Sequence, residues 1–579
     1  MAENQATEAL FDVAEQLLEW GIFMLKCLIP IIWLQSIFSP FQFLVLSVVV
    51  LLGYFLLTLS PPHDSAEPPL VKPKIPVLGH LIGLARSQVS YYSHISTQTQ
   101  LPAATLPIAH RKVYVLFDPI LQQAAIKSKD MEAQSFELFA SQIFGLTENT
   151  VHKIVGRDKD MESSHGTTDM EQVFKVAFSG DRLSKLINTK LGALADTLNA
   201  ISDGQGVEAE NLFQWLRETV SRATSKALWG EKANPYLDEE VMEAQWNFDT
   251  HMDNLLLGFL PSIVARTAYY ARKRVNAALE PYYRAHYDQD DPTVSEFVRG
   301  RARVLRSYGL PDDEIAKHEV SIMIAATTNA IPTLFWCNAR MFVHPGLLAE
   351  IRDEVSSALA VVLPTIAEDE SNSKSDQEEV KKEIKIPLVG LEAKCPLLAS
   401  VHKECLRLAS QAVTARRVLA DTTVFNPDGG QTYLLKANKD VIMPAKVVHR
   451  NPAIWGANDA DTFNPRRFLD TSEQQGKQLE KESGSGGGGE KLARLRKAAF
   501  VPFGGGRFLC PARKAVYMEN VAIMAAVALG FEVVGLDEGC LVMGDTGRGG
   551  IASPLEGMEG AKVNIRRREG WEGVVWSFG

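Results

Sequence analysis

The feature that most restricts the fold of this chain is an uncharged apolar run near its N-terminus. Residues 41–60, FQFLVLSVVVLLGYFLLTLS, contain no charged side chain. A helix of this length rises about 30 Å, which is the thickness of the hydrocarbon core of a bilayer. The run therefore predicts a transmembrane helix, and a buried core helix is the weaker alternative. A cleaved signal peptide is disfavoured, because the run is too long and lies too far from the first residue.

The charges on the two sides of this run predict its orientation. Acidic side chains dominate residues 1–40, whereas basic side chains follow the run between residues 72 and 86. Because basic flanks stay in the cytosol, we expect the rest of the chain to face the cytosol. Residues 1–40 are then lumenal or interfacial. Within them, the apolar stretch 21–38 is interrupted by Lys26 and Pro30 and is either interfacial or a second, weaker span.

Behind the run, the composition indicates a spacer, one large unit and two inserts. Residues 61–76 are rich in proline and predict a stiff, extended hinge. In residues 77–579, apolar side chains recur every three or four positions up to about Ile351, which predicts a mainly helical fold. Short strand-like pieces, TTVFN and QTYLL, add a small β part. Two polar low-complexity segments, 367–385 and 472–491, are expected to be surface loops.

Charge and cysteine content exclude several classes of function. The net charge is −10, so no overall basic field attracts nucleic acid. The six cysteines are scattered and form no C-x-x-C pair. We therefore expect neither a disulfide scaffold nor a structural zinc site, and we expect reduced thiols in the cytosol.

One glycine-rich stretch, FVPFGGGRFLCPAR at residues 500–513, leads to a cysteine. A dinucleotide-binding loop would need glycine where Leu509 stands, and a phosphate-binding P-loop would need Lys-Ser or Lys-Thr. What remains is a flexible turn that brings Cys510 to the first turn of a helix, with Pro511 at the first helical position. Free N–H groups and the helix dipole there favour the thiolate, which is a good axial ligand for haem iron. On this loop alone, a buried structural cysteine stays an equal alternative.

The loop resembles the haem-binding loop of the cytochrome P450 family, F-x-x-G-x-R-x-C-x-G. Phe503, Gly506 and Cys510 match that pattern. Phe508 and Ala512 depart from it, since the family has arginine and glycine there. Close backbone approach to a flat cofactor explains why glycine is needed in such a loop.

The resemblance also implies which basic residues contact the haem propionates. Arg507 lies one position before the family's arginine and is expected to substitute for it. The family commonly carries another propionate-binding arginine on a strand, which corresponds here to Arg416 or Arg417. The alternative for these two is an exposed charged pair.

A second resemblance is the E-x-x-R pair in SVHKECLRLAS. Glu404 and Arg407 are three residues apart and share one face of a predicted helix, so their side chains can pair. By itself, such a pair is usually a solvated helix surface. The following NPRRF is similar to the P-E-R-F segment of P450s, and this implies that Arg467 completes a Glu-Arg-Arg cluster. A buried network of this kind is better credited with fixing the packing behind the haem than with net stability.

The third resemblance is AATTNAIPTLFW, which aligns with the central helix of the family. Members usually carry an acid followed by threonine there, and these relay protons to oxygen; here the two positions are Thr328 and Asn329. Asparagine is a poor acid, so we expect proton delivery through ordered water. Pro332 removes the N–H that would bond the carbonyl of Thr328, and it is expected to open the helix there. A satisfied polar residue in a packed helix is the alternative for Asn329.

This asparagine resembles the branch of P450s that contains sterol 7α-hydroxylases, prostacyclin synthase and fungal relatives. The resemblance implies a cytochrome P450 fold, mainly α with a small β part, that binds haem b in the endoplasmic reticulum membrane. It implies a monooxygenase that oxidises an apolar small molecule, in specialised metabolism, with O2 and electrons from NADPH–cytochrome P450 reductase. Two alternatives stay open: a haem-thiolate peroxide isomerase or dehydratase, and a haem-binding sensor without turnover.

A basic cluster favours electron input from a reductase. Its members surround the predicted cysteine side of the haem, and they are Lys491, Arg494, Arg496, Lys497, Arg513 and Lys514. On an acidic protein, such a patch predicts a docking site for an acidic partner. A merely solvated charged face is the alternative.

Overall fold

The structure is a computed structural model of the chain. It describes residues 39, 42, 44–50, 63–73, 79–108, 111–132, 141–155, 165–360, 382–469, 488–506, 509–544, 549–555, 557, 560 and 562–579. Most of the predicted membrane run, of the segment before it and of the insert at 472–491 therefore lies outside the described residues, as do Arg507 and Phe508. Of the membrane run, Gln42 and residues 44–50 are helical, and nearly all their side chains are exposed.

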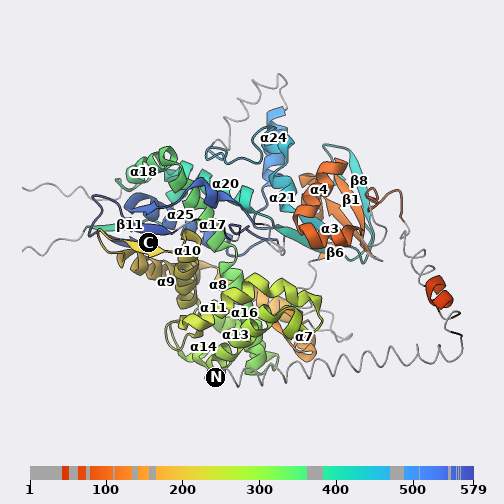
Figure 1. The fold of residues 1–579 in the computed structure, drawn as a ribbon, viewed down its shortest axis with the longest axis horizontal. Helices are drawn as coiled ribbons and strands as arrows, with labels where there is room; N and C mark the ends of the chain where they lie inside the picture. Colours follow the sequence, from red (N-terminus) through yellow and green to blue (C-terminus); the bar gives the residue numbers. More distant parts are fainter. Residues whose placement is uncertain are drawn as a thin grey trace, which may run out of the picture.

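Helices make up most of the described chain, as the spacing of apolar residues predicts (Figure 1). The long helices are α8 (His165–Ala177), α9 (Gly180–Asn199), α10 (Leu212–Trp229), α11 (Glu239–His251), α13 (Arg266–Arg284), α15 (Glu296–Ser307), α16 (Asp312–Thr327), α17 (Ala330–Val343), α18 (Pro345–Ala360), α20 (Pro396–Ala409), α24 (Gly488–Ala499) and α25 (Arg513–Gly530). The shorter ones are α3 (Gly79–Ser87), α4 (Ser90–Thr99), α5 (Pro119–Lys127), α7 (Glu148–Val155), α12 (Pro261–Val264), α14 (Tyr287–Asp290), α19 (Leu391–Lys394), α21 (Ala445–His449) and α22 (Pro452–Trp455), with 3-10 turns η1 (Pro235–Leu237), η2 (Met252–Leu257) and η4 (Glu538–Leu541).

The strands form four small sheets. The largest has the order β1-β2-β9-β6-β3, from β1 (Ala103–Ile108), β2 (Arg111–Leu116), β9 (Asp440–Pro444), β6 (Val413–Val418) and β3 (Met131–Glu132). A three-stranded sheet has the order β10-β11-β4, from β10 (Phe531–Val534), β11 (Val563–Arg567) and β4 (Val207–Ala209). Two further sheets are pairs of strands: β12 (Val575–Phe578) with β5 (Glu383–Ile386), and β7 (Thr422–Asn426) with β8 (Gln431–Leu435). The last pair is the predicted TTVFN and QTYLL.

Two parts of the sequence prediction need correction. Residues 103–116 fall in the region predicted to be mostly helical, yet they form the hairpin β1–β2, because β2 pairs in parallel with β9 from far along the chain. The predicted loops also end earlier than expected. Residues 383–385 belong to β5 and residues 488–491 to α24, since each packs against the body of the protein.

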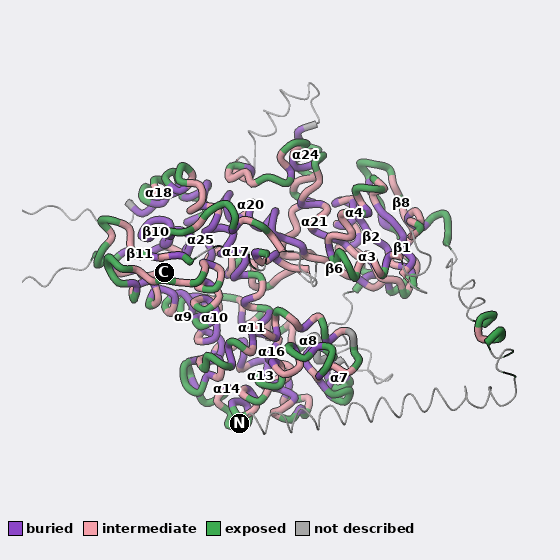
Figure 2. Tube along the Cα trace, viewed as in Figure 1, coloured by how far each residue is buried: buried purple, intermediate pink, exposed green. Residues whose placement is uncertain are grey.

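Helices α16 and α17 together form the central helix, and it joins two separate hydrophobic cores. The buried segments of these cores are coloured purple in Figure 2. Buried side chains of α16 pack with α13 and α10, whereas those of α17 pack with α20 and α25. In the part of the chain that the structure describes, one helical stretch, Asp312–Val343, is long and apolar enough to cross a membrane. It is this central helix, and 67% of its most apolar window is buried. The junction between α16 and α17, residues 328–329, thus lies where the two cores meet.

Candidate active site

The cysteine loop is closed by its own backbone and lies against α5. The N–H of Cys510 donates to the carbonyl of Phe503 at 3.1 Å, and the N–H of Leu509 donates to Gly506 at 3.2 Å. Gly506 has φ +63°, and a Cβ there would lie 2.7 Å from the carbonyl oxygen of Ile126. Only glycine therefore allows the loop to approach α5 this closely. Among the described cysteines, Cys510 alone is partly exposed, and the others are buried.

The helix start differs from the sequence prediction. Helix α25 begins at Arg513 with Ala512 as its N-cap, so Pro511 precedes the cap instead of occupying the first helical position. The ionisation of the Cys510 thiol also differs from the sequence prediction. Burial raises the pKa of Cys510, and this outweighs the lowering by the N–H groups of Ala512 and Arg513 and by the Arg513 charge. The expected thiolate preference is therefore not provided by the helix terminus alone, because desolvation penalises the charged form more strongly.

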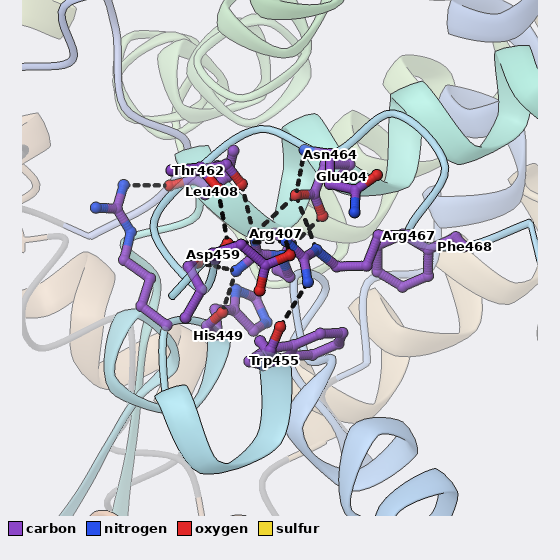
Figure 3. Close-up of polar contacts among 12 residues, drawn as sticks. Glu404, Arg407, Leu408, His449, Trp455, Asp459, Thr462, Asn464, Arg467 and Phe468 are labelled. Atoms are coloured by element: carbon purple, nitrogen blue, oxygen red, sulfur yellow. Dashed lines mark hydrogen bonds and ion pairs between the residues drawn. The ribbon is translucent and has the colours of Figure 1, made fainter. Parts of the chain in front are cut away.

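Behind the loop, Glu404, Arg407 and Arg467 are in direct contact (Figure 3). Arg407 donates to both oxygens of Glu404 at 2.8 Å, and Arg467 Nε donates to Glu404 Oε1 at 3.0 Å. Glu404 and Arg407 are fully buried, and Arg467 is 7% exposed. The remaining guanidinium donors bind backbone carbonyls of the segment 449–462, including His449 at 2.6 Å and Trp455 at 2.5 Å. One carboxylate thus holds α20 and this long irregular segment together.

His449 connects this network to the cysteine loop. Its carbonyl accepts from Arg407, and its ring Nε2 accepts from the N–H of Val501 at 2.9 Å. Burial lowers the pKa of His449 to about 3, and the nearby charge of Arg407 adds to this, so the ring is neutral and can accept. The carbonyl of Val501 in turn accepts from Gly504. The buried ion network therefore reaches the glycines of the loop through one histidine.

The two adjacent arginines of β6 point to different partners. Arg416 is 6% exposed, and its guanidinium lies 3.4 Å from the carbonyl oxygen of Gly505 in the cysteine loop. Arg417 forms an ion pair with Asp440 on β9 at 2.7 Å. Neighbouring residues of a strand face opposite sides of a sheet. Of the two candidates, the structure thus places Arg416 at the loop, and Arg417 is occupied elsewhere.

The central helix breaks at the two residues predicted to manage oxygen. Helix α16 ends at Thr327 and α17 begins at Ala330. At the break, Thr328 Oγ1 donates to Asp249 Oδ1 at 2.9 Å. Asp249 belongs to α11, 79 residues earlier in the chain. Thr328, at the position where the family usually has an acid, therefore contacts a carboxylate from a different helix.

Asn329 is held by the segment 549–555. Its Oδ1 accepts from the N–H of Ile551 at 2.9 Å, which leaves the amide nitrogen as a donor. Gly550 lies beside it, and a Cβ there would lie 2.8 Å from the same oxygen. The carbonyl of Gly550 also accepts from Gln411, just before β6. The strand that carries Arg416 therefore connects the cysteine loop with the segment that orients Asn329.

The predicted basic cluster is divided by the structure. Arg496 donates to the carbonyl of Ile454, and Arg513 donates to the carbonyl of Cys510. Both side chains are turned toward the protein. The four remaining members are exposed, and they are Lys491, Arg494, Lys497 and Lys514. A docking patch consists of these four at most, with Arg494 also paired with Asp428 at 3.1 Å.

Sequence reasoning missed His449, Asp249 and Gly550. No local pattern marks them, because each acts through a contact with a residue far away in the chain. The only available signal was indirect. The acid usual in the family is absent from the central helix, which left room for a carboxylate from another element beside Thr328.

The arrangement of donors fits a haem. The partly exposed thiol of Cys510 could ligate one metal ion. The buried guanidinium of Arg416 on β6 lies 3.4 Å from the Gly505 carbonyl of the same loop, where it could pair with a carboxylate at the edge of the group. Cys510 would hold the iron and Arg416 a propionate.

Comparison with known proteins identifies the family. A model of the cytochrome P450 family matches residues 68–554. A cytochrome P450 monooxygenase of Gibberella zeae is 29% identical over 532 residues, which cover 90% of this chain and 92% of that protein. Cytochrome P450 monooxygenase nodJ of Hypoxylon pulicicidum is 27% identical and covers 81% of this chain and 84% of its own length. Cholesterol 7-alpha-monooxygenase of Cricetulus griseus is 25% identical over 65% of this chain and 71% of its own length. The chain therefore belongs to the cytochrome P450 family, and it is an oxidoreductase whose cofactor is haem b.

Proposed function

We propose that this protein is a membrane-anchored monooxygenase that oxidises a C–H bond of an apolar small molecule in fungal specialised metabolism. The family and the fungal monooxygenases among its relatives support this reaction class. The observation that carries the proposal is the partly exposed Cys510 on a loop braced by the network around Glu404. When bound, haem b supplies the iron chemistry that activates O2 with electrons from NADPH.

Side chains of this chain have separate tasks in the proposal. Cys510 holds the iron, and Arg416 holds a propionate; Arg507, which lies outside the described residues, remains a second candidate for that task. Phe503 and Gly506 shape the loop. Thr328 and Asn329 position protons and water at the oxygen side, and Asp249 is the acid in hydrogen-bonding contact with Thr328.

The test is the absorbance of the full-length protein, reduced under carbon monoxide. We expect the band diagnostic of sulfur-ligated haem, and we expect C510S to lose it. The variant C540S is the control, because Cys540 is also a free cysteine but is buried away from the loop. An unchanged band in C510S would contradict the proposal.

A haem-thiolate peroxide isomerase or dehydratase is the second candidate. Asn329 favours it, because an amide donor can bind oxygen without supplying a proton. The hydrogen bond between Asp249 and Thr328 favours the monooxygenase, since it places an acid at the helix break. Transfer of one oxygen atom from O2 to the product, in the presence of NADPH and reductase, would identify the monooxygenase. Neither the isomerase or dehydratase nor a haem-binding sensor without turnover would give this result. Turnover of a hydroperoxide without NADPH would favour the isomerase.

Electron delivery and membrane attachment form the last part of the proposal. Lys491, Lys497 and Lys514 are exposed and would dock the acidic face of NADPH–cytochrome P450 reductase.

Residues 41–60 would anchor the protein in the endoplasmic reticulum membrane, with the hinge 61–76 leading to a catalytic domain, 77–579, in the cytosol. The exposed apolar side chains of residues 44–50 support an anchor. We expect deletion of residues 1–62 to release the protein from sedimenting membranes.

A further inference from the structure

A cavity of about 430 Å³ opens beside the break in the central helix. Its walls come from α10, α11, η2, both halves of the central helix, Gln88, Gly544 and residues 549–555. Thr328 and Pro332 line one side, so whatever occupies the cavity lies next to Thr328, one of the two residues assigned above to the oxygen side. The rest of the wall is mixed: apolar side chains such as Phe213, Ile331 and Leu555 lie beside polar and charged ones. The cavity therefore fits a ligand with an apolar skeleton and at least one polar group.

One side chain in this wall has an unmet hydrogen-bonding capacity. Arg217 of α10 lines the cavity, and its guanidinium lies 4.3 Å from the centre of the Trp246 ring. Its Nε is buried and has no hydrogen-bond partner in the described part of the chain. A buried donor without an acceptor is costly. Burial also lowers the pKa of Arg217, opposed by the charge of Asp249. Nε itself is shielded, so an acceptor in the cavity would bond the terminal guanidinium nitrogens, which also make no hydrogen bond within the described part of the chain.

The charges around Arg217 decide which acceptor fits. Asp249 and Asp253 line the same cavity, and the charge of Asp249 acts on the Arg217 guanidinium, so the wall carries two carboxylates and one guanidinium. An anionic ligand that approached Arg217 would also approach these like charges, which is unfavourable where water is excluded. A neutral oxygen meets the donor without that repulsion. A carbonyl oxygen suits it best, because it accepts hydrogen bonds and has no donor of its own that needs a partner.

We infer that Arg217 is a specificity-determining residue that binds a carbonyl oxygen of the substrate. The inference rests on the proposed function, and it names the substrate class: an apolar skeleton that already carries a ketone, ester or lactone group. Trp246 holds the guanidinium in place from one side. Asp249 lies within electrostatic range of Arg217 and accepts a hydrogen bond from Thr328. The carbonyl anchor and the oxygen-side residues are thereby coupled through one carboxylate.

The test uses three probes on one bicyclic skeleton: trans-decalin, trans-2-decalone and trans-decalin-2-carboxylate. Equilibrium dialysis of the full-length haem protein in detergent gives the Kd of each probe for the natural protein and for R217M. Methionine keeps a long stem against Trp246 and removes all donors. The ratio of the two Kd values cancels the partition of each probe into detergent.

We expect R217M to weaken the ketone about tenfold or more, as loss of a hydrogen bond from a charged donor does, and to leave decalin within about twofold. The control is R222M on the same helix. Arg222 is exposed and pairs with Glu239 at 3.6 Å, so all three ratios should stay near one. Equal ratios for ketone and decalin in R217M, or no binding of the ketone to the natural protein, would overturn the inference. So would a larger loss for the carboxylate than for the ketone.

Two further readouts keep the test decisive. If R217M does not assemble with haem, R217L also removes all donors with a shorter apolar side chain, and the ketone must again weaken relative to decalin. The sulfur-ligated haem band is recorded in parallel. Its absence from the natural protein would refute the proposed function, whereas an intact band with equal Kd ratios refutes the carbonyl anchor alone.

Discussion

Two adjacent arginines provide a sharp test of the buried network. Arg467 is 7% exposed and donates to Glu404, to the carbonyl of Trp455 and to Asp459. Arg466, its neighbour, is about half exposed and pairs with Glu350 on the surface. The substitutions R467M and R466M therefore remove the same chemical group one residue apart, from a buried and from an exposed ion pair.

The expected cost of R467M follows from its contacts. Glu404 keeps both hydrogen bonds to Arg407, so its charge stays compensated. What is lost is a charge-assisted bond to Glu404, a donor to the buried Trp455 carbonyl and the partly exposed contacts with Asp459. Together these amount to about 3–5 kcal/mol, in the range measured for breaking a buried pair. At 1.4 kcal/mol per factor of ten, the lower value changes the folding equilibrium constant about 100-fold. R466M should cost about 0–1 kcal/mol.

The measurement is urea denaturation of the full-length protein in detergent, followed by tryptophan fluorescence and by the carbon monoxide band. We expect a much lower urea midpoint for R467M by both signals, and a midpoint close to that of the natural protein for R466M. If the two variants unfolded at the same urea concentration, the network would not stabilise the segment behind the cysteine loop, and our account of the site would fail.

Three further predictions concern the site and its surroundings. Burial lowers the pKa of His402 and of His449 to about 3, so the unfolded chain, with histidines near 6.5, binds more protons between these values. Stability should be full above pH 6.5 and fall as pH drops, by about 2 kcal/mol per histidine at pH 5; a melting temperature independent of pH from 7.5 to 5 would contradict this. The substitution G550A should displace Asn329, because the new Cβ would lie 2.8 Å from its Oδ1, and we expect loss of product formation with the carbon monoxide band retained. The substitution D249N should raise the amount of hydrogen peroxide released per NADPH consumed, most strongly at high pH, because Asp249 is proposed to supply protons at the oxygen side. An unchanged ratio of hydrogen peroxide to NADPH would show that Asp249 does not supply these protons.

The sequence by itself determined the local features of this protein. A mainly helical chain with a small β part, the helix that carries Glu404 and Arg407 and the strands TTVFN and QTYLL all follow from apolar spacing and short-range patterns. The glycine-rich turn before Cys510 was also readable, because its residue types are demanded by backbone geometry within a few positions.

Only the tertiary structure decided which of these groups meet. Arg416 and Arg417 are equivalent by composition, and the face that each presents depends on how β6 pairs with β9. Asp249 reaches Thr328 because α11 packs beside the central helix, and His449 reaches Val501 because a long irregular segment is folded back on α20. Burial, too, raises the pKa of Cys510 more strongly than the helix terminus lowers it. Hydrogen bonds and desolvation depend on neighbours in space, and these are set by packing between distant segments, which a single sequence does not specify.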